Sequence, residues 1–373
     1  MAHGRTCLGT NPCQRWKHER GALHLGGMKS NPTAHDVARL AGVSQSAVSR
    51  TFTAGASVAP ATRERILAAA REIGYRPNAI ARSLITRRSR IVGLVMSYLE
   101  NQFYPLVIER FSQALQRNGY HVLLFISETA DADAILTDIL QYQVDGIVMA
   151  STTLSSGLAQ DCAKAGIPVV LFNRVAQLGA MGRFSTSSVT SQNREGGRLV
   201  GELLLRTGHR RIAWLAGLEN ASTSLDREAG LGEALEEAGL ALYARGVGRY
   251  DFAEAKRVVL EMFSDPATRP DALFAANDHM AIAALETLRT DLGLRVPEDV
   301  SVVGFDNVPQ AAWPSFNLTT VQQDVDRMVE ATRTLLFEQI DGEVLARSVT
   351  VPCVLVERGT VRVRESRRAL TSI

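Results

Sequence analysis

Three short stretches near the N-terminus carry apolar residues at helical spacing. The first begins after Thr33, which can cap the opening turn, and Gly42 can end it. Val37, Leu40 and Ala41 then fall on one helical face. We therefore expect an amphipathic helix that packs this face against its neighbours.

A second helix is predicted almost immediately afterwards, over residues 44–52. Ser44 is its candidate cap, and Val48 with Thr51 or Phe52 forms its buried stripe. The opposite face is polar and carries Gln45, Ser46, Ser49 and Arg50. This helix therefore presents short polar side chains and one cation to its surroundings.

The third helix is predicted over residues 60–73. It begins with proline, which the first turn tolerates because the N–H that proline lacks has no helical partner there. Its inward face carries Ile66, Leu67, Ala70 and Ile73. The pattern breaks near Tyr75, and a basic run over residues 87–90 closes the segment. We therefore expect a three-helix head followed by a linker.

From residue 91 onward, short β-branched runs alternate with amphipathic helical stretches. The predicted strands are residues 91–96, 121–125, 146–149, 169–172, 212–215, 272–275 and 300–303. The helical patterns between them include residues 104–118, 195–206 and 280–290. Strand–helix alternation favours parallel sheets covered by helices, and about ten such units indicate two lobes.

Charge is distributed unevenly along the chain, although the formal net charge is only +2. Residues 28–90 hold 11 Lys and Arg against 3 Asp and Glu, a net charge of +8, and residues 1–27 add +3. The remaining residues therefore carry a net charge of −9. A basic head joined to an acidic body indicates a polyanion-binding module attached to a second function.

Two helices joined by a tight turn, the second with a polar outer face, form the pattern of a helix-turn-helix. In that motif the second helix enters the major groove of DNA. Gln45 can pair with adenine, Arg50 with guanine, and Ser46 with several acceptors. An ordinary three-helix bundle with a solvated face has the same spacing. The basic charge favours DNA binding, because phosphate contacts need Lys and Arg.

Several other classes of protein are disfavoured. Four cysteines are too few and too scattered for a disulfide framework, which favours a reducing cytoplasm. Cys7 and Cys13, with histidines nearby, match no standard zinc spacing, so we expect no metal. No apolar run could span a membrane, and residues 1–27 lack a signal peptide. We expect that leader to be disordered, and Met28 is a candidate natural start.

The residues of the predicted helix-turn-helix read Asp36-Val-Ala-Arg-Leu-Ala-Gly-Val-Ser-Gln-Ser-Ala-Val-Ser-Arg50. Thr62-Arg-Glu64 and Ile73-Gly-Tyr-Arg-Pro-Asn-Ala-Ile-Ala-Arg-Ser-Leu84 continue in register. These residues resemble the headpiece of the lactose-repressor (LacI/GalR) family. The resemblance implies a homodimer whose two recognition helices read the half-sites of a palindromic operator in double-stranded DNA.

The resemblance also implies a role for the linker, residues 77–89. In this family the linker forms a hinge helix only on the operator, where a leucine wedges into the central base step. By position that residue is Leu84, with Ala81 packed beside it. An interdomain core leucine is the alternative, which the polar neighbours of Leu84 disfavour. Ordering of the hinge would then couple ligand binding to DNA binding.

Further landmarks follow in order beyond the linker. They include Asn101-Gln-Phe-Tyr-Pro105, Val144-Asp-Gly-Ile147, Ala276-Asn-Asp278 and Val303-Gly-Phe-Asp306. They resemble the periplasmic-binding-protein-like core of the same family. The resemblance implies an all-α head (residues 28–76) and an α/β core (residues 90–373) of two lobes with parallel sheets flanked by helices. Lobe 1 would hold residues of about 90–190 and 324–351, and lobe 2 residues 191–323 and 352–366, with three crossings between them.

The resemblance further places an effector in the cleft between the lobes. The polar contacts carried over by motif are Arg227, Asn277, Asp306 and Gln323, and Asn173 ends a predicted strand nearby. An aromatic residue such as Tyr98, Phe103 or Tyr250 can cover the apolar face of a sugar ring. A carboxylate that accepts from vicinal hydroxyls, beside Arg and Asn donors, suits a carbohydrate.

Each of these residues also has a structural alternative. Asp306 could cap a turn, Arg227 could pair with a surface carboxylate, and Tyr250 could belong to the core. Two departures from the family pattern also bear on the effector, because Asn173 and Gln192 stand where many members have Asp. They remove acceptor charge from the cleft region. A phosphorylated or acidic compound is therefore an alternative to a neutral sugar.

Together these features predict an effector-controlled transcription regulator, a repressor or an activator, that needs no cofactor. Residues 358–373 have no leucine heptads, which favours a dimer over a tetramer. A nucleotide-dependent enzyme is disfavoured because Gly246-Val-Gly248 lacks the third glycine and the position of a dinucleotide fingerprint. A solute-binding protein would require export.

Overall fold

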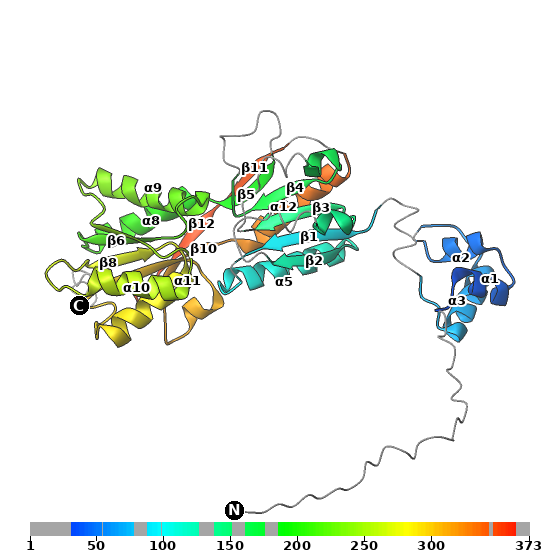
Figure 1. The fold of residues 1–373 in the computed structure, drawn as a ribbon, viewed down its shortest axis with the longest axis horizontal. Helices are drawn as coiled ribbons and strands as arrows, with labels where there is room; N and C mark the ends of the chain where they lie inside the picture. The colour runs from blue at the N-terminus through cyan, green and yellow to red at the C-terminus, as the bar shows by residue number, and fades with distance from the viewer. Residues whose placement is uncertain are drawn as a thin grey trace, which may run out of the picture. The chain divides into compact units, whose positions relative to one another are not determined.

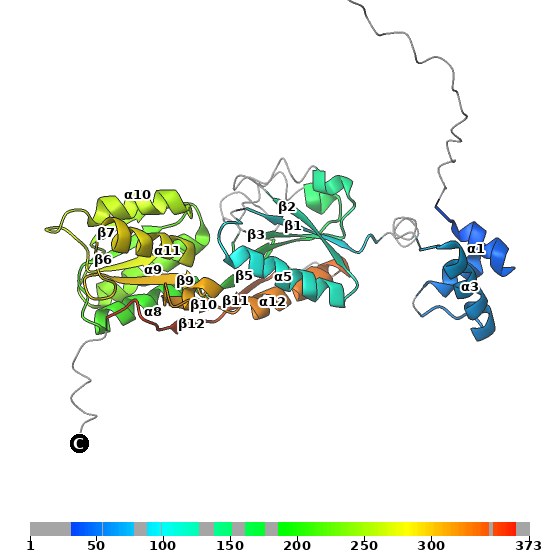
Figure 2. The same ribbon diagram turned by 90° about the horizontal axis from the view of Figure 1, so that it is seen from below.

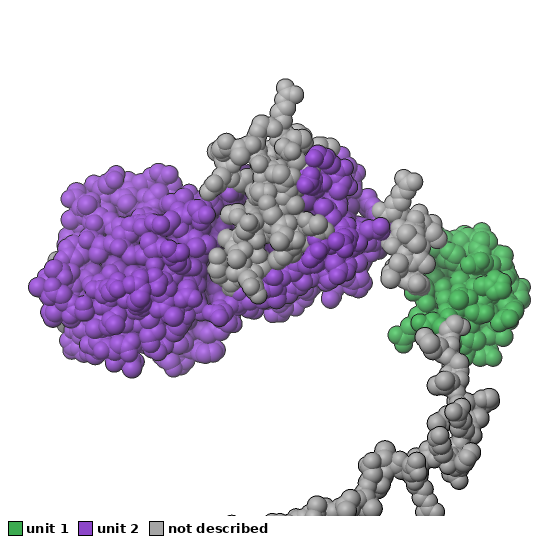
Figure 3. Space-filling model, in the orientation of Figure 1, with its two compact units in different colours: residues 1–82 green, residues 83–373 purple. Residues whose placement is uncertain are grey.

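The computed structural model describes residues 31–53, 55–77, 88–97, 99–126, 138–150, 161–175, 186–342 and 346–362. The chain divides into two compact units, residues 1–82 and residues 83–373 (Figure 3). Within the described ranges, no helix is long and apolar enough to cross a membrane.

The first unit is built from α1 (Ala34–Ala41), α2 (Gln45–Thr51) and α3 (Pro60–Ile73). Thr33 and Asp36 form a capping box at the start of α1, since each side chain accepts the backbone N–H of the other. Ser44 caps α2 by accepting the Ala47 N–H at 3.3 Å. The caps predicted for these two helices are confirmed.

The core of this head is small, and each helix contributes to it. Val37, Val48 and Ile66 are fully buried, one from each helix. The inward position predicted for Leu40 is wrong, because its side chain is 47% exposed. Ala38 completes the inward face of α1 instead, which lets the helices approach closely around the three larger side chains.

The described strands of the second unit form two six-stranded sheets, which Figure 1 shows side by side. The first sheet has the order β11-β5-β4-β3-β1-β2, and all its neighbours are parallel. Its strands are β1 (Ile91–Met96), β2 (His121–Ile126), β3 (Gly146–Ala150), β4 (Val169–Phe172), β5 (Ser187–Ser191) and β11 (Ser348–Val351). We call the part of the chain built on this sheet lobe 1.

The second sheet has the order β12-β10-β9-β8-β6-β7, in which only the edge strand β12 is antiparallel. Its strands are β6 (Ile212–Ala216), β7 (Ala244–Val247), β8 (Ala272–Ala275), β9 (Ser301–Asp306), β10 (Thr319–Gln323) and β12 (Cys353–Val356). We call the part built on it lobe 2. Its central strands are buried along their whole length, as expected for parallel strands covered on both faces.

Helices cover these sheets. In lobe 1, α5 (Phe103–Arg117) packs beside α12 (Val325–Ile340), as Figure 2 shows. In lobe 2, α8 (Asn193–Arg206) and α9 (Ser222–Glu237) cover one face of the sheet. The opposite face is covered by α10 (Phe252–Phe263) and α11 (Asp278–Glu286) (Figure 1). A π-helical turn η1 (Thr287–Asp291) continues α11, and a 3-10 turn η2 (Pro309–Ala312) follows β9.

Within the described part of this unit, the chain passes between the lobes three times, from β5 to α8, from β10 to α12 and from β11 to β12. The predicted fold class is confirmed: a helical head, and a two-lobed α/β core with parallel sheets flanked by helices. The predicted hinge residues Ala81 and Leu84 and the cleft candidate Tyr98 lie outside the described residues.

Helices α8 and α9 approach closely because glycines face the opposing backbone. A Cβ on Gly197 of α8 would overlap the carbonyl oxygen of Arg227, and a Cβ on Gly230 of α9 would overlap that of Arg194. Glycine is needed at both positions for steric reasons rather than for a special φ. This contact fixes the first turns of α9 against α8.

We expect Gly230→Ala to lower the free energy of unfolding by about 1–3 kcal/mol, because the added methyl group forces the two helices apart. Gly232 is the matched control, since it lies in the same helix and a Cβ there meets no atom within 4 Å. Gly232→Ala is expected to raise the free energy of unfolding by about 0.5–1 kcal/mol. Urea denaturation followed by far-UV circular dichroism measures both, and equal effects would show that close packing against α8 does not require glycine at residue 230.

Candidate functional site

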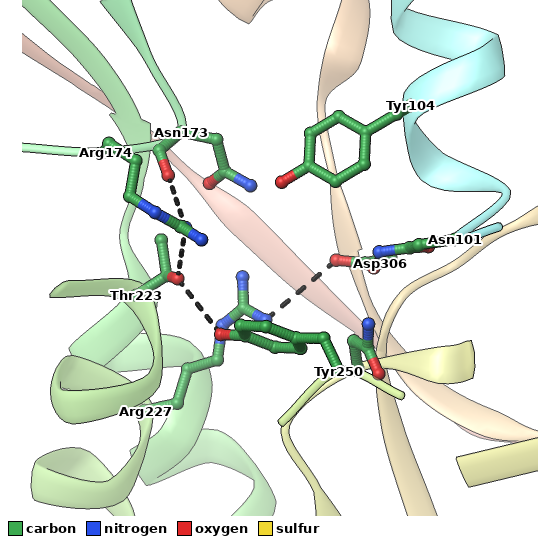
Figure 4. Close-up of a pocket in the computed structure, with 9 residues that line it drawn as sticks. Asn101, Tyr104, Asn173, Arg174, Thr223, Arg227, Tyr250 and Asp306 are labelled. Carbon is green, nitrogen blue, oxygen red and sulfur yellow. Dashed lines mark hydrogen bonds and ion pairs between the residues drawn. The ribbon is translucent and has the colours of Figure 1, made fainter. Parts of the chain in front are cut away.

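A pocket lies between the two lobes, at the carboxyl ends of their strands. It is lined by Asn101, Tyr104, Asn173, Arg174, Thr223, Arg227, Tyr250, Asn277 and Asp306 (Figure 4). Asn173 directly follows β4, Asn277 follows β8 after one residue, and Asp306 ends β9. Parallel sheets bind ligands at this edge, because loops there bring side chains from several strands together.

Arg227, in the second turn of α9, is buried in the wall of this pocket with 2% of its side chain exposed. Its Nε donates to the Asn193 Oδ1 at 2.8 Å, and its Nη1 donates to the Ala276 carbonyl. The guanidinium lies 3.5 Å from the centroid of the Phe305 ring. The surface ion pair considered from the sequence is therefore wrong for Arg227, whose partners are interior ones.

Asp306 faces Arg227 across 4.0 Å, measured from the Asp306 Oδ1 to the Arg227 Nη1. Its Oδ1 also accepts from the Gln323 Nε2 at 2.6 Å, and its Oδ2 accepts from the Asn101 Nδ2 at 3.4 Å. Burial raises the pKa of Asp306, and the Arg227 guanidinium opposes that rise. Asp306 has a φ of 127°, a strained backbone value of the kind found at ligand sites, and it lines the pocket.

Gln323 is not among the described residues that line the pocket, and its direct contact with an effector stays a prediction. Both ends of its amide are occupied, because its Oε1 accepts from the Ser191 Oγ at 2.7 Å while its Nε2 binds Asp306. It therefore positions Asp306. A second carboxyl group, Asp278, lies buried beyond Asp306. Burial and the neighbouring Asp306 charge raise the pKa of Asp278.

Two polar atoms of the pocket wall are buried and have no hydrogen-bond partner among the described residues. Asn277 caps α11 by accepting the Met280 N–H at 3.0 Å, which leaves its Nδ2 unpaired. The Asn173 Oδ1 is the other unpaired atom. Buried polar groups are rarely left without a partner, so one donor and one acceptor are available here for a ligand.

Aromatic side chains complete the pocket. The ring of Tyr250 packs on Gly217, where a Cβ would overlap it, and its hydroxyl lies 3.3 Å from the Thr223 Oγ1. Tyr104 also lines the pocket. The neighbouring Phe103, considered as a ring-covering residue, is 1% exposed and lies in the core of lobe 1. The tyrosines therefore supply the aromatic surface.

Arg174 is the pocket residue that sequence reasoning missed most clearly. It follows Asn173 in lobe 1, and its Nη1 donates to the Thr223 Oγ1 of lobe 2 at 2.8 Å. The Val175 N–H donates to the Ser222 Oγ at 3.3 Å beside it. These bonds, with the one from Asn101 to Asp306, join the lobes around the pocket. The only sequence signal for Arg174 was its place directly after a predicted cleft residue.

The head carries a second candidate surface on α2. Gln45, Ser46, Ser49 and Arg50 are all exposed, whereas Val48 and Thr51 on the other side of the helix are buried. The Ser46 Oγ lies 2.9 Å from the Ser44 Oγ, and the Arg50 Nε donates weakly to the Ser46 carbonyl at 3.4 Å. Within the described head, no further hydrogen bond or ion pair holds these side chains, so they are free to contact another molecule.

The described residues that line the pocket carry hydrogen-bonding and charged groups, which can bind a small polar ligand. The parts of the chain that the structure describes contain no group of three His, Cys, Asp or Glu side chains placed to hold a metal ion.

Comparison with known proteins matches both units to families. Residues 33–78 match the family model "Bacterial regulatory proteins, lacI family", and residues 202–361 match "Periplasmic binding protein-like domain". The chain is 36% identical over 345 residues to the transcriptional regulator CelR of Thermobifida fusca, covering 91% of this chain and 99% of that protein. It is 32% identical to the transcriptional repressor PurR of Erwinia tasmaniensis, covering 88% and 96%.

Solved structures show the same architecture. A complex of CelR with cellobiose has a TM-score of 0.65 and 32% identity, and covers 88% of this chain and 99% of that one. The lac repressor dimer bound to operator and the anti-inducer ONPF has a TM-score of 0.78 and 26% identity, covering 89% and 99%. The chain therefore belongs to the LacI family of DNA-binding transcription regulators.

Proposed function

We propose that this protein is a repressor that works as a homodimer on a palindromic operator and is controlled by a small polar effector in the cleft between its lobes. The observation that carries the effector site is the pair of unpaired buried atoms, Asn277 Nδ2 and Asn173 Oδ1, in a pocket beside Arg227 and Asp306. The similarity of this chain to CelR, whose structure was solved with cellobiose, and to the transcriptional repressor PurR supports this function.

The exposed face of α2 reads the operator in this proposal. Gln45, Ser46 and Ser49 are short enough to approach base edges, and Arg50 can donate two bonds to one guanine. The net charge of +8 over residues 28–90 supplies attraction to phosphates. Binding to chromosomal DNA places the protein in the bacterial cytoplasm. We assign the head to residues 28–76 and the hinge, with Ala81 and Leu84 at its minor-groove contact, to residues 77–89.

The effector is a sugar or a sugar derivative in this proposal. Asp306 and the Asn173 Oδ1 accept from ligand hydroxyls, the Asn277 Nδ2 and Arg227 donate, and the Tyr250 ring covers an apolar face. These residues come from both lobes. A ligand that binds one arrangement of the lobes more tightly than another shifts the equilibrium toward the arrangement that it prefers.

The described end of the linker is firmly attached to lobe 1. The Ser89 and Arg90 N–H groups donate to the Asp145 carboxylate at 2.8 and 2.9 Å, and the Arg88 Nη2 donates to Asp341 at 2.9 Å. A movement of lobe 1 therefore moves the base of the linker. We propose that the two hinges of a dimer order together on the operator only in one arrangement of the lobes.

We expect Arg50→Ala to weaken binding to an operator, selected from a random DNA library by the wild-type protein, by about 1–3 kcal/mol. The loss arises because Arg50 contacts a base. Affinity for unrelated DNA of equal length should fall much less, in a titration at fixed salt. Arg71→Ala removes the same charge from α3 and should leave the ratio of operator to unrelated DNA binding unchanged. Equal loss on both DNAs for Arg50→Ala would contradict the base contact.

We expect Asp306→Asn to weaken effector binding at least about 10-fold while affinity for the operator without effector stays unchanged, because a charged acceptor is lost from the cleft alone. The measurement is a thermal-shift titration with neutral sugars, sugar acids and sugar phosphates, repeated as an operator-binding titration. Asp299→Asn changes a surface carboxylate of lobe 2 and serves as the control. A wild-type ligand response in Asp306→Asn would remove Asp306 from the site.

A further inference from the structure

The pocket between the lobes has an excess of positive charge. Three charged side chains line it among the described residues: Arg174, Arg227 and Asp306. Asp306 lies 4.0 Å from Arg227 and is the one carboxylate among these three side chains. Arg174 forms no ion pair with any carboxylate in the described part of the protein. One cation in the wall of the cleft is therefore unbalanced.

Arg174 is also buried, with only 6% of the residue exposed. Its Nη1 donates to two neutral oxygens, the Asn173 carbonyl at 2.9 Å and the Thr223 Oγ1 at 2.8 Å. Its guanidinium carbon lies 6.0 Å from the centroid of the Tyr250 ring. A buried charge is costly unless it is paired, and guanidinium offers five N–H donors in a fork that fits carboxylate or phosphate. Within the described residues, Arg174 therefore has no anionic partner to balance its buried charge.

The hydrogen-bonding groups of the pocket also favour an anionic ligand. The Asn277 Nδ2 is an unpaired donor and the Asn173 Oδ1 an unpaired acceptor, and each carboxylate oxygen of Asp306 already accepts one amide N–H group, from Gln323 or Asn101. Among the described residues, Arg174 forms hydrogen bonds only through its Nη1, so its Nε and Nη2 add further N–H donors. Donors therefore predominate among the groups left for a ligand. A hydroxyl group offers one donor for each oxygen, while a carboxylate or phosphate oxygen only accepts.

We infer that the effector of this protein is anionic, a sugar derivative or similar small polar molecule bearing a carboxylate or phosphate, and that Arg174 binds the anionic group. This inference rests on the proposed function, because it names the class of ligand for the same cleft. Arg174 comes from lobe 1 and Arg227 from lobe 2, and both guanidinium groups face the pocket (Figure 4). An anion that binds both guanidinium groups contacts both lobes, so its binding depends on how the lobes are arranged.

A purely structural Arg174 would instead hold the lobes together through Thr223. The two roles differ in what the loss of charge changes. A structural role affects every ligand of the cleft equally, because every ligand needs the same arrangement of the lobes. If Arg174 binds an anion, its loss lowers the affinity for charged ligands only. The ratio of the affinities for a charged ligand and its neutral counterpart therefore distinguishes the two roles.

The test is isothermal titration calorimetry of the full chain with matched ligands: D-glucose, D-gluconate, D-glucuronate and D-glucose 6-phosphate, their galactose counterparts, and cellobiose with cellobionate. We expect the anionic member of a set to bind at least about 30-fold more tightly than its neutral counterpart, as for a buried charge pair. Carboxylates and phosphates form separate arms, so the set also shows which anion fits. Tighter binding of the neutral member, or no binding by any anionic member, would overturn the inference.

Arg174→Gln should reduce this preference to within about 3-fold while affinity for the neutral member stays close to that of the wild type, and Arg174→Lys should retain part of it. Arg245→Gln, at a surface ion pair of lobe 2, controls for general effects of charge. Operator binding and circular dichroism verify folding, and Arg174→Lys keeps the test valid if the glutamine variant is unstable. Equal losses for neutral and anionic ligands would overturn the role of Arg174.

Failure of the inference and failure of the proposed function have different signatures. If a neutral sugar binds more tightly and changes operator affinity, the anionic effector is wrong and effector-controlled DNA binding stands. If an anionic ligand binds in an Arg174-dependent way without changing operator affinity, the ligand class is supported and effector control is contradicted.

Discussion

The buried guanidinium of Arg227 is the interaction on which the pocket depends. It joins the start of α8 through Asn193, the end of β8 through Ala276 and the end of β9 through Phe305 and Asp306. Its position is fixed because glycines bring the backbones of α8 and α9 into contact. Removing one partner of a buried charge leaves the other uncompensated, so these residues form one unit rather than separate contacts.

The pocket is connected to the segments that cross between the lobes. Ser191 ends β5 just before the first crossing, Gln323 ends β10 just before the second, and Ser191, Gln323 and Asp306 form a chain of hydrogen bonds. Asp306 is therefore linked by hydrogen bonds to the residues that precede these two crossings, and a ligand that binds Asp306 contacts this chain. On the far side of lobe 1, Asp145 and Asp341 hold the base of the linker. The effector site is thus built from both lobes, and the base of the linker is attached to lobe 1.

Much of the fold could be predicted from the sequence because most strands are apolar runs and the helices of the head have clear caps. The strand β5 was missed because it reads Ser-Ser-Val-Thr-Ser, although every residue in it is buried. Its hydroxyl groups are satisfied by partners distant in the sequence, such as Ser348 and Gln323, which no local pattern reveals. The family landmarks located Arg227, Asn277 and Asp306. Arg174 and Tyr104 needed the structure, since their positions depend on how the two lobes meet.

In the proposed mechanism the cleft and the head are thermodynamically coupled. Coupling between two binding sites is reciprocal, so a ligand that changes operator affinity by some factor must have its own affinity changed by the same factor when the operator is bound. The most direct measurement is a calorimetric titration of an identified effector into the full chain, once alone and once saturated with operator DNA. We expect a change of about 5- to 150-fold in effector affinity, equal to the change that the effector produces in operator affinity. An effector affinity that is the same with and without operator would contradict it.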